Sequence, residues 1–262
     1  MLGDKLRFRF AKTGTLRLLS HNDLMRSTER MLRRADLPFK STAGFHPSPR
    51  VHFALSLPLG VEGLDEVVEM EFTRELDADD VLAKLNEQAP AGLSFRRVSV
   101  VPLRTTAMPR RVVYRLALPP DCIAAAAERS AELMSQSTVW VDRLRPSPKR
   151  LNVRPYFRSL RVRDGALLLD LWVTQTGTAR ADELLRLLNL ADLLESGAVT
   201  ERLTVELHDE VLNLDPADGP PVSPAETLPL DPAALAALTR RDDDEVTAAA
   251  GWGLSPAGPV VE

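Results

Sequence analysis

Two short stretches, residues 20–26 (SHNDLMR) and 44–50 (GFHPSPR), gather side chains that could bind an anion or move a proton. Three of the chain's four histidines lie in or beside them, namely His21, His46 and His52. Ser20 is a typical helix N-cap, and the free backbone N–H groups and dipole at a helix start favour an anion. We therefore expect an anion-binding site here, whose ligand is a substrate, RNA or the carboxylates of a partner.

Cationic side chains surround these stretches and strengthen that prediction. Arg26, Arg30 and Arg33 follow one another at spacings of four and three residues, which places them on one face of a helix expected over 20–36. A solvated helix face is the simpler interpretation of such a stripe. We nominate eight residues of this region for anion or nucleic-acid binding: Lys12, Arg17, Ser20, His21, Arg26, Arg30, His46 and Arg50.

His21 and His46 are also the candidates for a catalytic base, should the protein be an enzyme. A histidine in the first turn of a helix feels its positive end and tends to stay neutral, so it can accept a proton. Capping or packing explains the same position without any chemistry. The histidines match neither H-x-H nor H-E-x-x-H spacing and Cys122 is the single cysteine, so we expect no metal site and no cofactor.

The densest positive charge lies in residues 143–163, which contain eight Lys and Arg side chains and no acid. Self-repulsion disfavours such a density unless a counter-charge is bound. The phosphates of a nucleic acid would supply one, and so would the chain's own acidic tail. We nominate four of these residues for nucleic-acid binding: Lys149, Arg150, Arg154 and Arg158.

Hydrophobic periodicity predicts an α+β protein built from tandem, duplicated ferredoxin-like β-α-β-β-α-β units. The first unit (1–104) has expected strands at 5–10, 50–57, 66–76 and 93–101, and helices at 20–36 and 77–89. The second (105–212) has expected strands at 111–118, 159–163, 166–174 and 199–208, and helices at 122–135 and 181–195. On the outer sheet face, Arg7 and Arg9 should pair with Glu69 and Glu71 across neighbouring strands, although such a face could also bind an anion.

Residues 213–262 carry nine acids and two bases and are rich in Pro and Ala. We expect them to form a largely disordered acidic tail with a short helix near 232–239. The tail carries −7 while the whole chain carries −4, which leaves residues 1–212 at +3. The chain shows no signal peptide, no apolar run near the roughly 18 residues of a membrane span, and no nucleotide-loop or nucleophile motif. We therefore expect a cytoplasmic protein that does not enter a membrane.

Several motifs carry a family resemblance, which covers about residues 5–210. They are Arg7-x-Arg9-Phe10-x-Lys12-x-Gly14, Ser20-His21-x-Asp23-Leu24-Met25-Arg26, Gly44-Phe45-His46-Pro47-x-Pro49, Arg154-Pro155 and Gly177-Thr178-Ala179-Arg180. They resemble the radical-SAM-linked protein family, a domain of unknown function encoded beside or fused to radical SAM proteins. Asn22 and residues 149–153 depart from the family pattern. The resemblance implies a stand-alone accessory domain for a separate radical SAM enzyme, and it supplies no catalytic residues.

Three functions are compatible with these features. The first is a non-catalytic accessory protein that binds RNA (tRNA or rRNA) on a basic surface and presents it to the radical SAM enzyme. The second is a metal-independent RNA-processing enzyme that uses a histidine base. The third is a protein-interaction module that docks an acidic partner.

Overall fold

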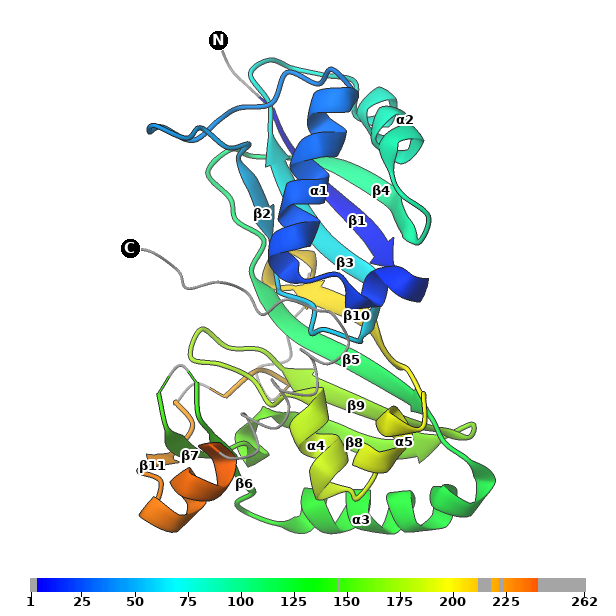
Figure 1. The fold of residues 1–262 in the computed structure, drawn as a ribbon, viewed down its shortest axis with the longest axis vertical. Coiled ribbons are helices and arrows are strands. Elements are labelled where there is room, and N and C mark those ends of the chain that lie inside the picture. Colours follow the sequence, from blue (N-terminus) through cyan, green and yellow to red (C-terminus); the bar gives the residue numbers. More distant parts are fainter. Residues whose placement is uncertain (1–3, 146, 212–217, 222–223, 240–262) are drawn as a thin grey trace. The chain divides into compact units, whose positions relative to one another are not determined.

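The computed structural model describes residues 4–145, 147–211, 218–221 and 224–239. It shows a mixed α+β protein with one eight-stranded mixed sheet and one three-stranded sheet (Figure 1). The chain divides into two compact units. Unit 1 comprises Met1–Ser135 and Tyr156–Pro221, and unit 2 comprises Gln136–Pro155 and Val222–Glu262. The large sheet belongs to unit 1 and the small sheet to unit 2.

The amino-terminal part of the large sheet contains β1 (Lys5–Lys12), β2 (Val51–Phe53), β3 (Glu62–Glu71) and β4 (Leu93–Val101). β1 lies antiparallel between β3 and β4, and β2 pairs with the other side of β3. Helices α1 (His21–Arg34) and α2 (Ala78–Gln88) cover one face of these strands (Figure 1). Leu6, Phe8 and Phe10 alternate along β1 toward the helices and are buried, as the period of two predicts.

The carboxy-terminal part contains β5 (Pro109–Ala117), β8 (Phe157–Arg163), β9 (Ala166–Trp172) and β10 (Thr200–Leu207). These strands follow one another in the antiparallel order β10-β5-β9-β8. The helix α3 (Ile123–Ser135) packs on β8 and β9. A short parallel pairing of Glu201 and Arg202 in β10 with Glu62 and Gly63 in β3 joins the two parts into one sheet.

The single helix expected over 181–195 is in fact two helices, α4 (Ala181–Leu187) and α5 (Ala191–Glu195). Asn189 between them has φ +56°, in the left-handed region. The Leu190 N–H reaches back to the Leu185 carbonyl at 2.8 Å, which is the pattern of a helix C-terminal cap. The leucine periodicity continues across this break, so the periodicity alone did not show it.

Unit 2 contains β6 (Trp140–Arg143), β7 (Lys149–Asn152) and β11 (Thr227–Leu228), paired in the order β11-β7-β6. The sequence did not predict strands here. The predicted short helix is confirmed at 232–239, and the Asp231 side chain accepts hydrogen bonds from the Ala233 and Ala234 N–H groups at its start. The rest of the predicted disordered tail falls mainly on 212–217, 222–223 and 240–262, outside the described residues.

Candidate functional site

α1 is capped by Ser20, as predicted. The Ser20 hydroxyl accepts a hydrogen bond from the Asp23 N–H at 3.2 Å and donates one to the Asp23 carboxylate at 2.6 Å. Asp23 therefore places a negative charge at the positive end of the helix, and it also contacts Arg26 at 3.4 Å. An external anion at this helix start would have to compete with the carboxylate of Asp23.

His21, the first residue of α1, is half-buried. Its ring packs edge-on against Phe53 of β2, with 5.5 Å between the ring centroids. Burial lowers the pKa of His21, and the positive charge of Lys12 lowers it further. Both causes disfavour the imidazolium, so the ring is neutral near pH 7 and can accept one hydrogen bond while donating another.

Lys12 lies beneath the start of α1. Its side chain is almost completely buried, at 1% exposure, and its ammonium donates to the Leu19 carbonyl at 2.8 Å. Burial lowers the pKa of Lys12, while the carboxylate of Glu66 acts in the opposite direction. Lys12, nominated from the sequence for anion binding, therefore does not contribute to an exposed surface.

Glu66 also pairs with Arg202 of β10, which is completely buried. Arg202 Nε donates to Glu66 Oε1 at 2.7 Å, and Nη2 contacts the second carboxylate oxygen. The remaining donors reach the carbonyls of Ser56 and Leu55 and the hydroxyl of Tyr114. With its five N–H groups engaged in this way, Arg202 has a structural role and offers no donor to a ligand.

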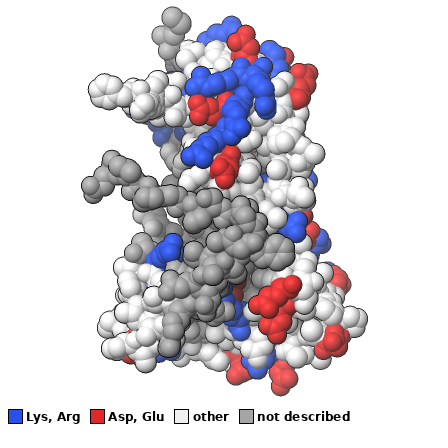
Figure 2. Space-filling view, in the orientation of Figure 1, with Lys and Arg blue, Asp and Glu red and all other residues white. Residues whose placement is uncertain are grey.

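The exposed side of α1 carries four arginines, which we call the α1 arginine face: Arg26, Arg30, Arg33 and Arg34. Figure 2 shows Lys and Arg side chains gathered over this helix. Arg26 and Arg33 each contact a carboxylate within α1. In the described part of the chain, Arg30 and Arg34 donate only to backbone carbonyls. Four cations against two carboxylates give α1 a formal surplus of +2.

The second predicted stretch forms a loop between α1 and β2, here called the 41–49 loop. Its residues 41–48 are exposed, including His46 and the neighbouring Phe45. At the base of the loop, Lys40 and Arg50 share the carboxylate of Glu71, at 3.5 and 3.3 Å. The base of the loop thus carries two cations that share one acid.

Arg17 lies in the 3-10 helix η1 (Gly14–Leu18), where it donates to the Gly14 carbonyl at 3.0 Å. It lines a cavity of about 370 Å³, whose other walls are largely apolar and include Leu18, Leu59 and Leu194. A second cavity, of about 350 Å³, brings Thr178 and Arg180 of the Gly177–Arg180 motif beside Tyr114 and Arg202. His21 and His46 line neither cavity.

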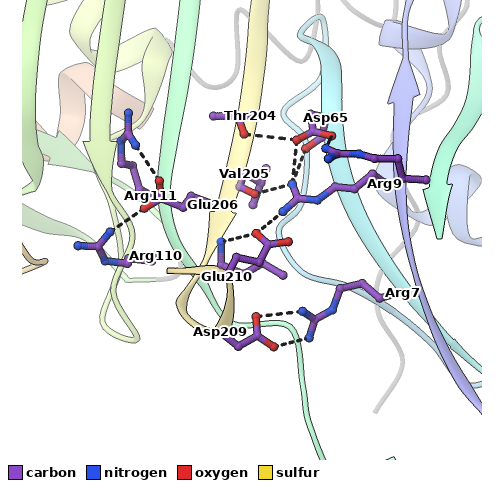
Figure 3. A network of polar contacts seen from close by, with 12 residues as sticks. Arg7, Arg9, Asp65, Arg110, Arg111, Thr204, Val205, Glu206, Asp209 and Glu210 are labelled. Carbon is purple, nitrogen blue, oxygen red and sulfur yellow. Dashed lines mark hydrogen bonds and ion pairs between the residues drawn. The ribbon is translucent and has the colours of Figure 1, made fainter. Parts of the chain in front are cut away.

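On the sheet face opposite the helices, arginines of unit 1 are held in a network of ion pairs (Figure 3). Arg7 contacts Glu69 at 2.9 Å, which confirms this predicted cross-strand pair, and Asp209 of η4 (His208–Glu210) at 2.8 Å. Arg9 contacts Asp65 at 3.0 Å and also Glu210. Glu71 does not join this network. It binds the base of the 41–49 loop, so the predicted pairing of both arginines with Glu69 and Glu71 is only half correct.

Arg158 of β8 is neutralised in the same way. It contacts Asp170 and Asp218, both at 2.8 Å, and its guanidinium lies 5.6 Å from the ring centroid of Trp172. The two carboxylates raise the pKa of Arg158, and Arg158 lowers the pKa of Asp218. Because Asp218 belongs to the predicted acidic tail, a tail carboxylate supplies the counter-charge for this arginine.

The other three nominated cations of the basic segment, Lys149, Arg150 and Arg154, belong to unit 2, whereas the remaining nine nominated residues belong to unit 1. Arg150 of β7 lies 3.5 Å from Asp142 of β6. Arg154 donates to the Gln136 carbonyl at 2.9 Å. The residues predicted to form one basic surface are thus divided between two units.

Within the described ranges, no three His, Cys, Asp or Glu side chains are placed to hold a metal ion. Of the helices that the structure describes, none combines the length and the apolar character needed to cross a membrane. The exposed cations of unit 1 that remain as a candidate site are the α1 arginine face and, at the base of the 41–49 loop, Lys40 and Arg50.

The two sheets and their helices define an α+β protein. The chain belongs to a family described as "Uncharacterized protein conserved in bacteria (DUF2344)", whose model matches residues 5–183, more than half of the chain. Among solved structures, a proposed glycine cleavage system transcriptional repressor is similar at 10% identity and a TM-score of 0.23, over 76% of this chain and 96% of that one. At that TM-score we draw nothing from the likeness. No curated protein matches the chain.

Proposed function

We propose that this protein binds RNA through the α1 arginine face and serves, without chemistry of its own, as an accessory to a separate radical SAM enzyme. One observation carries the proposal: α1 presents four arginines to solvent against two carboxylates, and Arg30 and Arg34 contact no acid in the described part of the chain. RNA phosphates are a counter-charge that fits such a surplus. We expect the RNA to be tRNA or rRNA.

The contrast with other arginines of unit 1 supports this choice of surface. Each of four arginines on the opposite sheet face contacts two of the chain's own carboxylates: Arg7, Arg9, Arg111 and Arg158. These side chains could bind phosphate only by breaking ion pairs that already exist. Within the α1 arginine face, Arg30 and Arg34 donate to backbone carbonyls and contact no acid in the described part of the chain, so a phosphate could bind them without breaking an ion pair.

We infer further that the large sheet consists of two ferredoxin-like units, one before and one after about residue 104. The order β4-β1-β3-β2 in the first part and β10-β5-β9-β8 in the second support this, because equivalent strands occupy equivalent places. β6 and β7 would then be an insertion between the first helix and the second strand of the second unit. A duplicated scaffold of this kind leaves its outer helix faces free for binding.

The link to a radical SAM enzyme is supported by the motif resemblance. The printed sequence contains one cysteine, so it offers no set of three thiolates for an iron–sulfur cluster. The cluster chemistry would therefore reside in the separate enzyme, and both proteins would meet in the cytoplasm. Co-purification of the two proteins from a nuclease-treated lysate would support direct contact, and loss of the enzyme on nuclease treatment would indicate that RNA bridges them.

The RNA-binding proposal is tested with the double charge reversal Arg26→Glu/Arg30→Glu. We expect weaker binding of a labelled tRNA in fluorescence anisotropy, together with a salt-dependence slope smaller by roughly two, because two phosphate contacts are lost. The control is a charge reversal at two exposed arginines elsewhere, Arg129→Glu/Arg163→Glu, which changes the net charge equally. Equal losses in both variants would show that only net charge matters and would contradict the proposal.

A further inference from the structure

The 41–49 loop is closed at its neck by backbone hydrogen bonds. Ser41 and Pro49 form an isolated antiparallel bridge, and the Thr42 N–H donates to the Ser48 carbonyl at 2.8 Å. The Ser48 N–H donates to the Thr42 hydroxyl at 3.1 Å, and the Arg50 N–H to the Lys40 carbonyl at 2.8 Å. Because both strands of the neck are tied together, the loop presents its tip in a defined direction, away from the body of unit 1 (Figure 1).

The tip of this loop exposes a single large apolar side chain. Phe45 has a relative exposure of 102%, the highest among the exposed large hydrophobic residues of the described chain. Gly44 before it has φ +134°, a backbone conformation that L side chains rarely adopt. Because the Phe45 ring stays exposed to water, it contributes no hydrophobic stabilisation to the folded protein. Such a side chain is placed to be covered by a ligand.

The loop that carries Phe45 is polar, and cations flank its neck. The other residues of 41–48 are small or polar, apart from Pro47. Lys40 and Arg50 at the neck outnumber the one carboxylate, Glu71, that they share. Arg33 of the α1 arginine face lies over the ring of Phe39 at 5.2 Å, directly before the loop. The loop is thus joined through Phe39 to the surface on which we place the RNA.

We propose that Phe45 stacks on an unpaired base of the bound RNA, while Lys40, Arg50 and the α1 arginine face hold the flanking phosphates. This inference rests on the proposed RNA binding and names its kind of substrate, a single-stranded loop or bulge. A lone exposed aromatic on a loop with cations at its neck suits this mode, in which a base stacks on the ring while positive charges bind the backbone phosphates. A protein–protein interface has an apolar core built from several side chains, whereas residues 41–48 expose Phe45 as their one large apolar side chain.

The test compares Phe45→Ala, Phe45→Leu and Phe45→Trp against an RNA hairpin with an unpaired loop and a fully paired duplex of equal length. For the hairpin we expect Phe45→Ala and Phe45→Leu to weaken binding by about tenfold, with an unchanged salt slope, because stacking releases no counterions. Phe45→Trp should retain affinity, and the added indole fluorescence should be quenched by the hairpin. The duplex, whose bases are already stacked, should bind all the variants equally.

The outcomes distinguish failure of the stacking inference from failure of the proposed RNA binding. If Phe45→Ala binds the hairpin as the wild-type protein does while Arg26→Glu/Arg30→Glu does not, the stacking inference is overturned and RNA binding stands. If Phe45→Leu retains full affinity, the contact is apolar and not aromatic, which also overturns it. If the wild-type protein binds neither RNA at low salt, both proposals fail together. Phe45 has no packing role, so unchanged far-UV circular dichroism is expected for the variants.

Discussion

His21 shows how the start of α1 sets the protonation of a single side chain. The His21 ring packs edge-on against Phe53 and lies near the buried ammonium of Lys12. Burial of the His21 ring disfavours its charged form because it removes water from the ring. The positive charge of Lys12 disfavours the same form by repulsion. This makes His21 a neutral group that can contribute a hydrogen bond, and its half-buried position limits how closely a substrate can approach it.

The shift of His21 has a consequence for stability that can be measured. Folding lowers its pKa below the ordinary 6.5, so the unfolded chain binds more protons between the two values. The stabilising contribution is fully present above pH 6.5 and is lost as the pH falls through the folded-state pKa. We expect His21→Gln to remove this part of the pH dependence of the free energy of unfolding, measured by urea denaturation. An NMR titration that places the pKa of His21 at or above 6.5 would contradict this.

At the scale of residues, the sequence predicted the environment of a side chain correctly where its neighbours lie within a few positions along the chain. The Ser20 cap and the exposed arginines of α1 depend on spacings of three or four residues, which the sequence displays directly. The burial of Lys12 and the pairing of Glu66 with Arg202 depend on residues from β1, β3 and β10 meeting in space. Nothing in the local pattern around Lys12 distinguishes a buried cation from an exposed one.

At the scale of elements, the break between α4 and α5 depends on Asn189, whose left-handed backbone allows the chain to turn. Its side chain is exposed, so substitutions there report on the backbone rather than on packing. We expect Asn189→Gly to be tolerated and Asn189→Val to lower the free energy of unfolding by about 1–2 kcal/mol, since a β-branched residue opposes this conformation. Urea denaturation gives the comparison. A Val variant as stable as the Gly variant would mean that the helices can merge or shift.

Most elements of the large sheet follow from periodicity, because the alternation of apolar and polar residues is a property of each strand on its own. β1 and β10 lie close to the ranges predicted for them. β2 is much shorter than expected, and β3 begins and ends several residues early. β6 and β7 were missed since their charged residues hide the alternation. They pair with each other, and β7 also pairs with β11, a segment more than 70 residues away. Strands that depend on such distant partners show little of the apolar–polar alternation by which a strand is predicted from sequence.

At the scale of the molecule, the two parts of the large sheet are joined by ion pairs and side-chain hydrogen bonds as well as by backbone pairing. The backbone pairing of β3 with β10 spans only two residue pairs. Arg202 adds the buried contact to Glu66, and Arg9 donates to the Val205 carbonyl at 2.7 Å (Figure 3). Arg7 and Arg9 also bind the acids of η4, which follows β10. These contacts add side-chain links between the two parts to a backbone ladder that is short.

We therefore expect the two parts of the large sheet to unfold in one transition, and Arg202→Met to destabilise both. Removing the guanidinium leaves the buried carboxylate of Glu66 without its two contacts to Arg202, which should cost about 3–5 kcal/mol. Trp172 in β9, made the only tryptophan by Trp140→Phe and Trp252→Phe, reports on the second part in urea, and hydrogen exchange of the β1 amides reports on the first. Adding Glu66→Gln to Arg202→Met should restore part of the loss, because the uncompensated charge is then gone. Separate midpoints for the two reporters in the wild-type protein would show instead that the junction is too weak to couple the two parts.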